Sequence, residues 1–120
     1  MSNSARTVFV FGWYLVGLGV VLVTVPNVIL QMSFLPPTDE VWVRVVGMLV
    51  LCLAYYYINA ARAGLRPMLE WTVHVRLTIV AWFTAFVVLG FAEWPLILFG
   101  ATDFAAALWT RAALRAEARG

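Results

Sequence analysis

The chain has no lysine, one cysteine and one histidine, and only 12% of its 120 residues are charged. The single Cys52 excludes an internal disulfide, and with one histidine the sequence offers no spaced set of soft metal ligands. Signatures of catalysis are also missing, because there is neither an HExxH pair nor a phosphate-binding glycine loop. We therefore predict no cofactor and no metal.

The shortage of charge accompanies long hydrophobic runs. Hydrophobic residues make up 64% of the chain and the mean hydropathy is +0.93. Four apolar stretches, at residues 8–30, 41–61, 71–91 and 94–114, each reach the roughly 20 residues that a helix needs to cross a bilayer. The sequence predicts an all-α, up-down, four-helix transmembrane bundle forming one integral membrane domain over residues 1–120. Because Pro26 interrupts the first stretch, its helix is expected to stop near Val25 before a short interfacial turn or helix.

Charged residues at the ends of these stretches predict the orientation. Cytoplasmic segments of membrane proteins carry an excess of arginine and lysine, which favours an inner location for both termini. The absence of lysine is typical of a GC-rich bacterial genome, so we expect a bacterial inner membrane. Arginines at loop ends indicate topology rather than nucleic-acid binding. The inner side would hold Arg6, Arg62, Arg66, Arg111, Arg115 and Arg119, and the outer side Asp39, Glu40, Glu93 and Arg44.

Asp103 is the most informative polar residue because it falls about 14 Å into the fourth stretch, near the bilayer centre. A carboxylate there costs roughly 2.5–3.5 kcal/mol on insertion scales, so it must face the bundle and be protonated or paired. Arg44 and Arg76 lie at comparable distances in depth, and the lean of helical side chains favours Arg44. The predicted intramembrane polar cluster, structural or ligand-binding, is Arg44, Tyr55, Asn59, His74, Arg76 and Asp103.

Two chemical roles for His74 stay open at this stage. A lone histidine can ligate haem or a chlorin magnesium, but no second ligand or binding motif accompanies it. Together with Asp103 it could move a proton on a lipid substrate. That role requires both side chains to reach one substrate, whereas their expected depths differ by about 12 Å.

Three segments of the chain bear on its family: Val41-Trp42-Val43-Arg44-Val45-Val46-Gly47, Tyr55-Tyr56-Tyr57 with Ala60-Ala61-Arg62, and Leu98-Phe99-Gly100-Ala101-Thr102-Asp103. These segments resemble small four-helix bacterial inner-membrane proteins of the DoxX type. The resemblance implies a four-helix inner-membrane protein and carries no reaction with it. In size the chain is also similar to small multidrug-resistance transporters, but its first stretch lacks the acidic residue on which those proteins depend.

The sequence supports three functional hypotheses. The first is a non-catalytic accessory or scaffolding subunit that packs against a larger membrane complex or self-associates, as the small-residue pairs Ala81/Ala85 and Ala101/Ala105 suggest. The second is a small-molecule or lipid carrier with a cavity around Arg44, Tyr55, Asn59 and Asp103. The third is a lipid-directed enzyme that uses Asp103 and His74.

Overall fold

The chain folds into helices joined by short connections. The structure, a computed structural model, describes residues 1–119, and within them it contains five helices and no strand. The helices are α1 (Asn3–Thr24), α2 (Pro26–Met32), α3 (Val41–Ala63), α4 (Arg66–Val88) and α5 (Leu96–Arg119). All of them except α2 are long and apolar enough to cross a membrane. The all-α, up-down prediction is confirmed.

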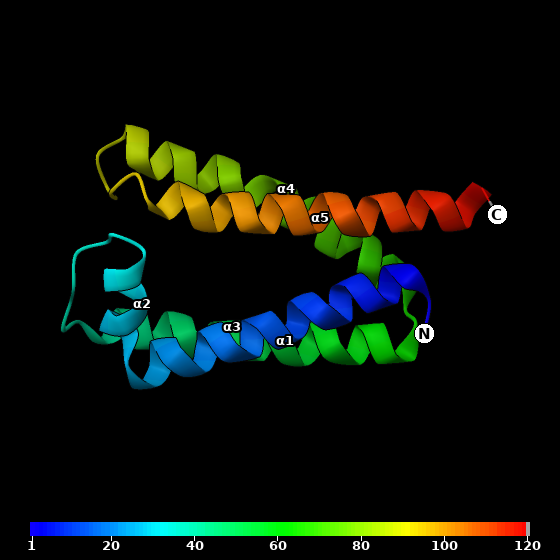
Figure 1. Ribbon diagram of the computed structural model, residues 1–120, viewed down its shortest axis with the longest axis horizontal. Coiled ribbons are helices and arrows are strands. Elements are labelled where there is room, and N and C mark those ends of the chain that lie inside the picture. Colours follow the sequence, from blue (N-terminus) through cyan, green and yellow to red (C-terminus); the bar gives the residue numbers. More distant parts are fainter. Residues whose placement is uncertain (120) are drawn as a thin grey trace.

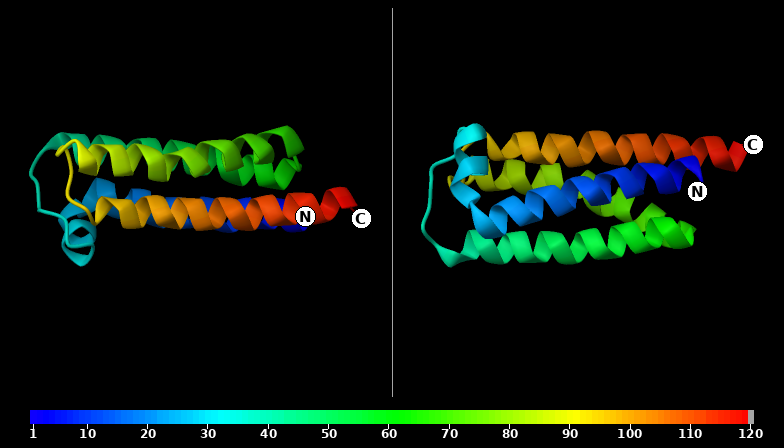
Figure 2. Two further views of the ribbon diagram at one scale, coloured as in Figure 1. Left: turned by 90° about the horizontal axis from the view of Figure 1, so that it is seen from above. Right: turned by 60° about the horizontal axis from the view of Figure 1, so that its bottom comes forward.

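The long helices form two hairpins that meet along one edge. Helix α1 packs against α3, and α4 packs against α5, while the main contact between the hairpins joins α1 to α5 (Figure 1). Both termini lie at one end of the molecule and α2 lies at the other (Figures 1 and 2). The longest dimension is 48 Å, close to the roughly 40–45 Å of a bilayer with its headgroups.

Proline and glycine mark several helix ends, including the break that the sequence predicts at Pro26. Helix α1 stops at Thr24, and the predicted short helix follows with Pro26 in its first turn. Gly64 ends α3 in a left-handed conformation (φ 64°) that favours glycine. The predicted start of the third stretch at residue 71 is wrong, because α4 begins at Arg66 with Pro67 in its first turn. Proline suits that position since its fixed φ is already helical and no N–H is lost from the ladder.

Glycines let α1 and α3 approach closely. A Cβ on Gly47 would lie 2.8 Å from Cβ of Leu22, and one on Gly19 would lie 3.0 Å from the carbonyl oxygen of Gly47. A Cβ on Gly12 would lie 2.8 Å from Ile58. Such contacts replace the hydrophobic driving force that is missing between helices in lipid. The α1–α3 hairpin is therefore the tightly packed half on which the second hairpin rests.

Candidate functional site

An apolar cavity of about 390 Å³ lies between the two hairpins, at the end of the molecule that α2 occupies. This volume falls within the range of roughly 300–1,000 Å³ typical of small-molecule sites. All five helices or their flanking loops contribute to the wall, and α2 with Leu35 closes one side. The lining residues are Tyr14, Leu15, Leu18, Leu22, Ile29, Leu30, Leu35, Val43, Val46, Val50, Leu53, Ile79, Phe83, Leu96, Phe99 and Asp103.

Asp103 is the one charged residue in this wall. It faces the bundle, as the sequence predicts, on the side of α5 that also carries the buried Gly100, Ala107 and Thr110. The buried cation Arg76 reaches the same helix two turns further on, where it bonds Thr110. No ion pair shorter than 4 Å joins Asp103 to a cation within residues 1–119. One face of the Asp103 side chain is therefore available to whatever occupies the cavity.

Arg76 is only 1% exposed and reaches α5 at Thr110, two helical turns after Asp103. Its guanidinium donates to Oγ1 of Thr72 at 3.1 Å and to Oγ1 of Thr110 at 3.0 Å. Its Cζ stands 4.8 Å from the ring centre of Phe11 and 5.9 Å from that of Tyr57, which is a cation–π arrangement. Its Nη1 has no hydrogen-bond partner in the described part of the chain. Residues of α1, α3, α4 and α5 therefore surround the buried guanidinium of Arg76, whose Nη1 donates no hydrogen bond among the described residues.

Polar contacts close the hairpins together at the terminal end. Thr7 of α1 and Thr110 of α5 share a hydrogen bond of 2.6 Å between their hydroxyls. Nearer the termini, Glu117 accepts from the backbone N–H of Ser4 at 2.9 Å and from its hydroxyl at 2.6 Å. Arg66 of α4 donates to the same carboxylate at 3.2 Å. These contacts hold the two hairpins together at the terminal end. The apolar cavity lies toward the opposite end, beside α2.

The predicted pairing of Arg44 with Asp103 is wrong. Nη1 of Arg44 donates to the carbonyl oxygens of Val23 and Thr24 at the end of α1. Arg44 therefore satisfies carbonyls that the last turn of α1 leaves free, which is a capping role. Arg76, the second choice from the sequence, is buried and bonds Thr110 on the inner face of α5, but it forms no ion pair with Asp103 either.

The predicted cavity face of the second stretch is also wrong. Tyr55 is 69% exposed, and Asn59 is exposed with its amide donating to the carbonyl of Tyr55. The inward tyrosine is Tyr57, at 6% exposure. Small residues seven apart, Gly47, Ala54 and Ala61, mark the buried face of α3 and would have located Tyr57 between them.

His74 and Asp103 do not share a cavity. His74 is exposed on α4 and borders a separate groove with α5. The acid–base pair that the enzyme hypothesis needs is therefore not assembled around one substrate. No cluster of three metal-ligating side chains occurs within residues 1–119.

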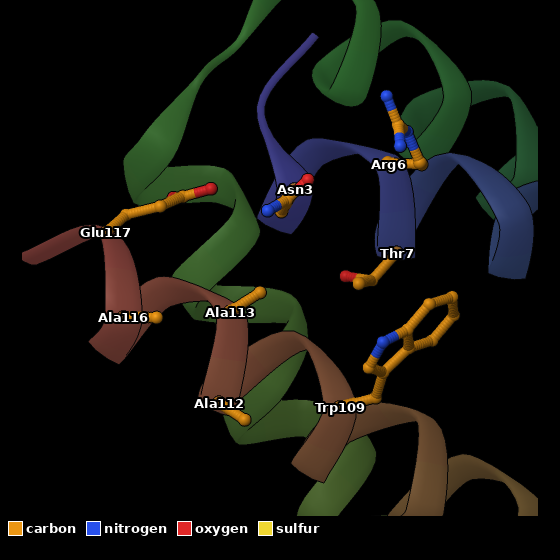
Figure 3. Close-up of a pocket in the computed structure, with 8 residues that line it drawn as sticks. All are labelled: Asn3, Arg6, Thr7, Trp109, Ala112, Ala113, Ala116 and Glu117. Atoms are coloured by element: carbon orange, nitrogen blue, oxygen red, sulfur yellow. The ribbon is translucent and has the colours of Figure 1, made fainter. Parts of the chain in front are cut away.

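A third hollow, of about 450 Å³, lies beside these contacts, between the start of α1 and the end of α5. Figure 3 shows Thr7 and Trp109 on its two sides, Arg6 at its α1 rim, and alanines of α5 along the other wall. Its carboxylate, Glu117, is already bonded to Ser4 and Arg66. This hollow therefore lies between packed helices, and its carboxylate is not available to a ligand.

Sequence reasoning missed the groups that hold Arg76. Phe11 and Tyr57 are apolar or amphipathic, and Thr7, Thr72 and Thr110 are common in helices, so none stood out singly. Only the pair of Thr72 and Arg76 could have indicated this arrangement. Thr72 precedes Arg76 by one helical turn, and its hydroxyl and carbonyl oxygens both accept hydrogen bonds from Arg76.

The fold and site together define a helical bundle whose long helices suit a membrane and whose hairpins enclose an apolar cavity. No protein-family model, no curated protein and no solved structure matches this chain.

Proposed function

We propose that this protein is a non-catalytic, multi-pass protein of the bacterial inner membrane that binds an apolar small molecule or lipid chain between its hairpins. The observation that carries the proposal is the apolar cavity of about 390 Å³ with Asp103 as its one charged group. Ligand sites typically combine an apolar wall with a few polar groups that fix orientation. The expected ligand is therefore mostly hydrocarbon and carries one group that donates a hydrogen bond to the Asp103 carboxylate.

The proposed orientation places both termini in the cytoplasm. Both lie at one end of the molecule (Figure 1), and six of the eight arginines lie toward that end, among them Arg6, Arg66 and Arg115 near helix termini. The opposite end holds the acidic residues Asp39, Glu40 and Glu93. This asymmetry supports an inner location of the termini. The likeness to DoxX-type proteins stays a prediction.

The binding proposal is tested by filling the cavity. Leu18 lines it from α1, whereas Val20, two residues along the same helix, is exposed on the outer surface. Native mass spectrometry of protein extracted gently from its own membranes should detect a bound small molecule with wild-type protein and with Val20→Trp. Leu18→Trp should lose it, because the indole occupies the same space.

Either of two results would contradict the proposal. One is a wild-type protein that carries no molecule beyond general membrane lipid. The other is equal retention by Leu18→Trp and Val20→Trp while both keep wild-type helicity by circular dichroism. Asp103→Asn refines the outcome, since it should weaken retention of a ligand that donates to the carboxylate and leave a pure hydrocarbon unaffected.

A second function, as an accessory or self-associating subunit, is favoured by a different observation. The small residues Ala81, Ala85, Ala101 and Ala105 are exposed, so the packing inside the bundle does not use them. Small residues at this spacing allow close approach of another helix in lipid. Ala101→Leu should then reduce the amount of any co-isolated complex, whereas Gly17→Leu, at an open position on α1, should not. Equal complex formation by both variants would exclude this surface.

A further inference from the structure

A groove of about 380 Å³ runs between α4 and α5 at the terminal end of the molecule. It shares no residue with the cavity between the hairpins, so a ligand in the groove does not depend on the function proposed for that cavity. Its rim carries Arg66, Arg111 and Arg115 together with His74, its one carboxylate, Glu70, is paired with Arg66, and its walls include Leu77 and Leu114. The groove therefore combines cations with hydrocarbon on one surface.

Helical spacing brings these residues together. On α4, Arg66 and His74 are eight residues apart and Leu77 follows three later, which keeps them on one face. On α5, Arg111 and Arg115 are one turn apart. The two helices are antiparallel neighbours, and Nη2 of Arg66 donates to the carbonyl of Leu114 at 3.0 Å, which fixes their register.

Most of the positive charge in the groove has no internal partner. Arg66 pairs with Glu70 at 3.6 Å and with Glu117 at 3.2 Å. Arg111 and Arg115 form no ion pair within residues 1–119, and both are exposed. Two free guanidinium groups beside an exposed imidazole are suited to phosphate, which accepts from arginine in paired hydrogen bonds.

The groove also changes character along its length. Leu77 lies about 16 Å further along α4 than Arg66 by the helical rise, on the way to the middle of the bundle. The cationic part is therefore at the end of the helices, where headgroups lie, and the apolar part is deeper. A free anion would use only the first part, whereas a phospholipid fills both.

We propose that this groove is a binding site for one anionic phospholipid, with its phosphate on Arg111 and Arg115 and an acyl chain against Leu77. The positive charge of Arg66 is largely neutralised by Glu70 and Glu117. Arg66 therefore forms part of the rim, and Arg111 and Arg115 bind the phosphate. Lipids of this charge are attracted to basic segments at the cytoplasmic face of membranes.

Native mass spectrometry of the detergent-solubilised full chain, titrated with phosphatidylglycerol or phosphatidylcholine, tests the site. Wild type should retain the first of these lipids about tenfold more tightly, and R111Q/R115Q should lose about that factor, because each basic group near a membrane contributes on the order of a fewfold to tenfold. R6Q/R62Q removes the same charge from exposed positions at the same end of the molecule. This control should change retention less than about twofold, because neither Arg6 nor Arg62 lines the groove and exposed charges away from the phosphate are screened.

Equal loss in R111Q/R115Q and R6Q/R62Q would overturn the proposal, because net charge alone would then explain retention. Equal retention of the two lipids by wild type would overturn it as well. Leu77→Trp distinguishes a lipid from a headgroup alone: it should weaken phosphatidylglycerol retention severalfold, whereas unchanged retention, with displacement by inorganic phosphate, would assign only an anion site and contradict a lipid. Circular dichroism confirms that each variant retains its helices.

Discussion

The two ends of the interface between the hairpins are built differently. At the terminal end, Ser4, Thr7, Thr110 and Glu117 form hydrogen bonds between α1 and α5. At the α2 end, the facing side chains are almost all aliphatic or aromatic, and a cavity separates them. Apolar surfaces gain little by meeting each other in lipid, since the lipid tails are equally apolar. Hydrogen bonds therefore hold the hairpins together at the terminal end, although a hollow of about 450 Å³ lies beside them. At the α2 end, the space between the hairpins is lined by apolar side chains with Asp103 as the one charged residue.

Arg76 stands at the boundary between these two ends, and its loss should have the largest effect. Arg76→Met removes three hydrogen bonds, to the carbonyl and hydroxyl of Thr72 and to the hydroxyl of Thr110, together with the buried positive charge. We expect a loss of about 3–4 kcal/mol in the free energy of unfolding, because hydrogen bonds from a charged donor contribute about 1.5–3 kcal/mol each, partly offset because the charge is no longer desolvated. Reversible unfolding in SDS-containing mixed micelles, followed by circular dichroism, measures it.

A double variant decides whether the charge or the packing of Arg76 matters. Arg76→Met/Asp103→Leu should recover part of the loss, because no uncompensated carboxylate remains. The exposed Arg62→Met should change stability by less than about 0.5 kcal/mol. A double variant no more stable than Arg76→Met would show that the guanidinium acts through its threonine bonds alone.

Leucine truncation compares packing at the two ends directly. Leu69 is 2% exposed and belongs to the core beside Ala5 and Val8, whereas Leu18 borders the cavity. Leu69→Ala should cost about 2–3 kcal/mol, since it opens a void in a packed region. Leu18→Ala should cost about 1 kcal/mol, because its site is already part of a cavity. Equal costs in the same unfolding assay would mean that the α2 end is as tightly packed as the other.

Thr110 supplies the polar contact in the middle of the closed end. Thr110→Val keeps the shape and removes the hydroxyl that bonds Thr7 and Arg76. The expected loss is about 1–2 kcal/mol, near the upper limit for side-chain hydrogen bonds in membranes because two partners are left. Thr102→Val, whose exposed hydroxyl bonds only within its own helix, should be close to neutral. If Thr110→Val leaves the free energy of unfolding unchanged, the hydrogen bond between Thr7 and Thr110 does not help to hold the hairpins together.

The sequence predicted the helices well because length and hydropathy are local properties. Four stretches, the break at Pro26 and the end at Gly64 follow from single residues and runs. It predicted the direction of Asp103 for a similar reason, since a carboxylate deep in a helix has only one tolerable side.

Side-chain partners were harder to predict because they depend on how two helices rotate. Helical spacing places Tyr55 and Asn59 on one face with Arg44, yet a tyrosine near a helix end is satisfied at the headgroup level. The small residues Gly47, Ala54 and Ala61 mark the buried face instead. Depth and the lean of helical side chains match Arg44 to Asp103, whereas Arg44 bonds the free carbonyls of Val23 and Thr24. Depth along a helix can be counted from sequence, but the angle around it requires the packing surface.

Glu117 offers the smallest and most local test of closure, at the outermost contact between the hairpins. Glu117→Gln keeps an acceptor for Ser4 and removes the charge that Arg66 meets at 3.2 Å. The pair is partly exposed, so the loss should stay below about 1 kcal/mol. It should shrink further at high salt, since exposed charges are screened. Glu93→Gln at the opposite end, where no ion pair forms among the described residues, should show neither effect. A salt-independent loss would mean that Glu117 closes the hairpins through its hydrogen bonds to Ser4, as the threonines do deeper in the bundle, and that its charge is incidental.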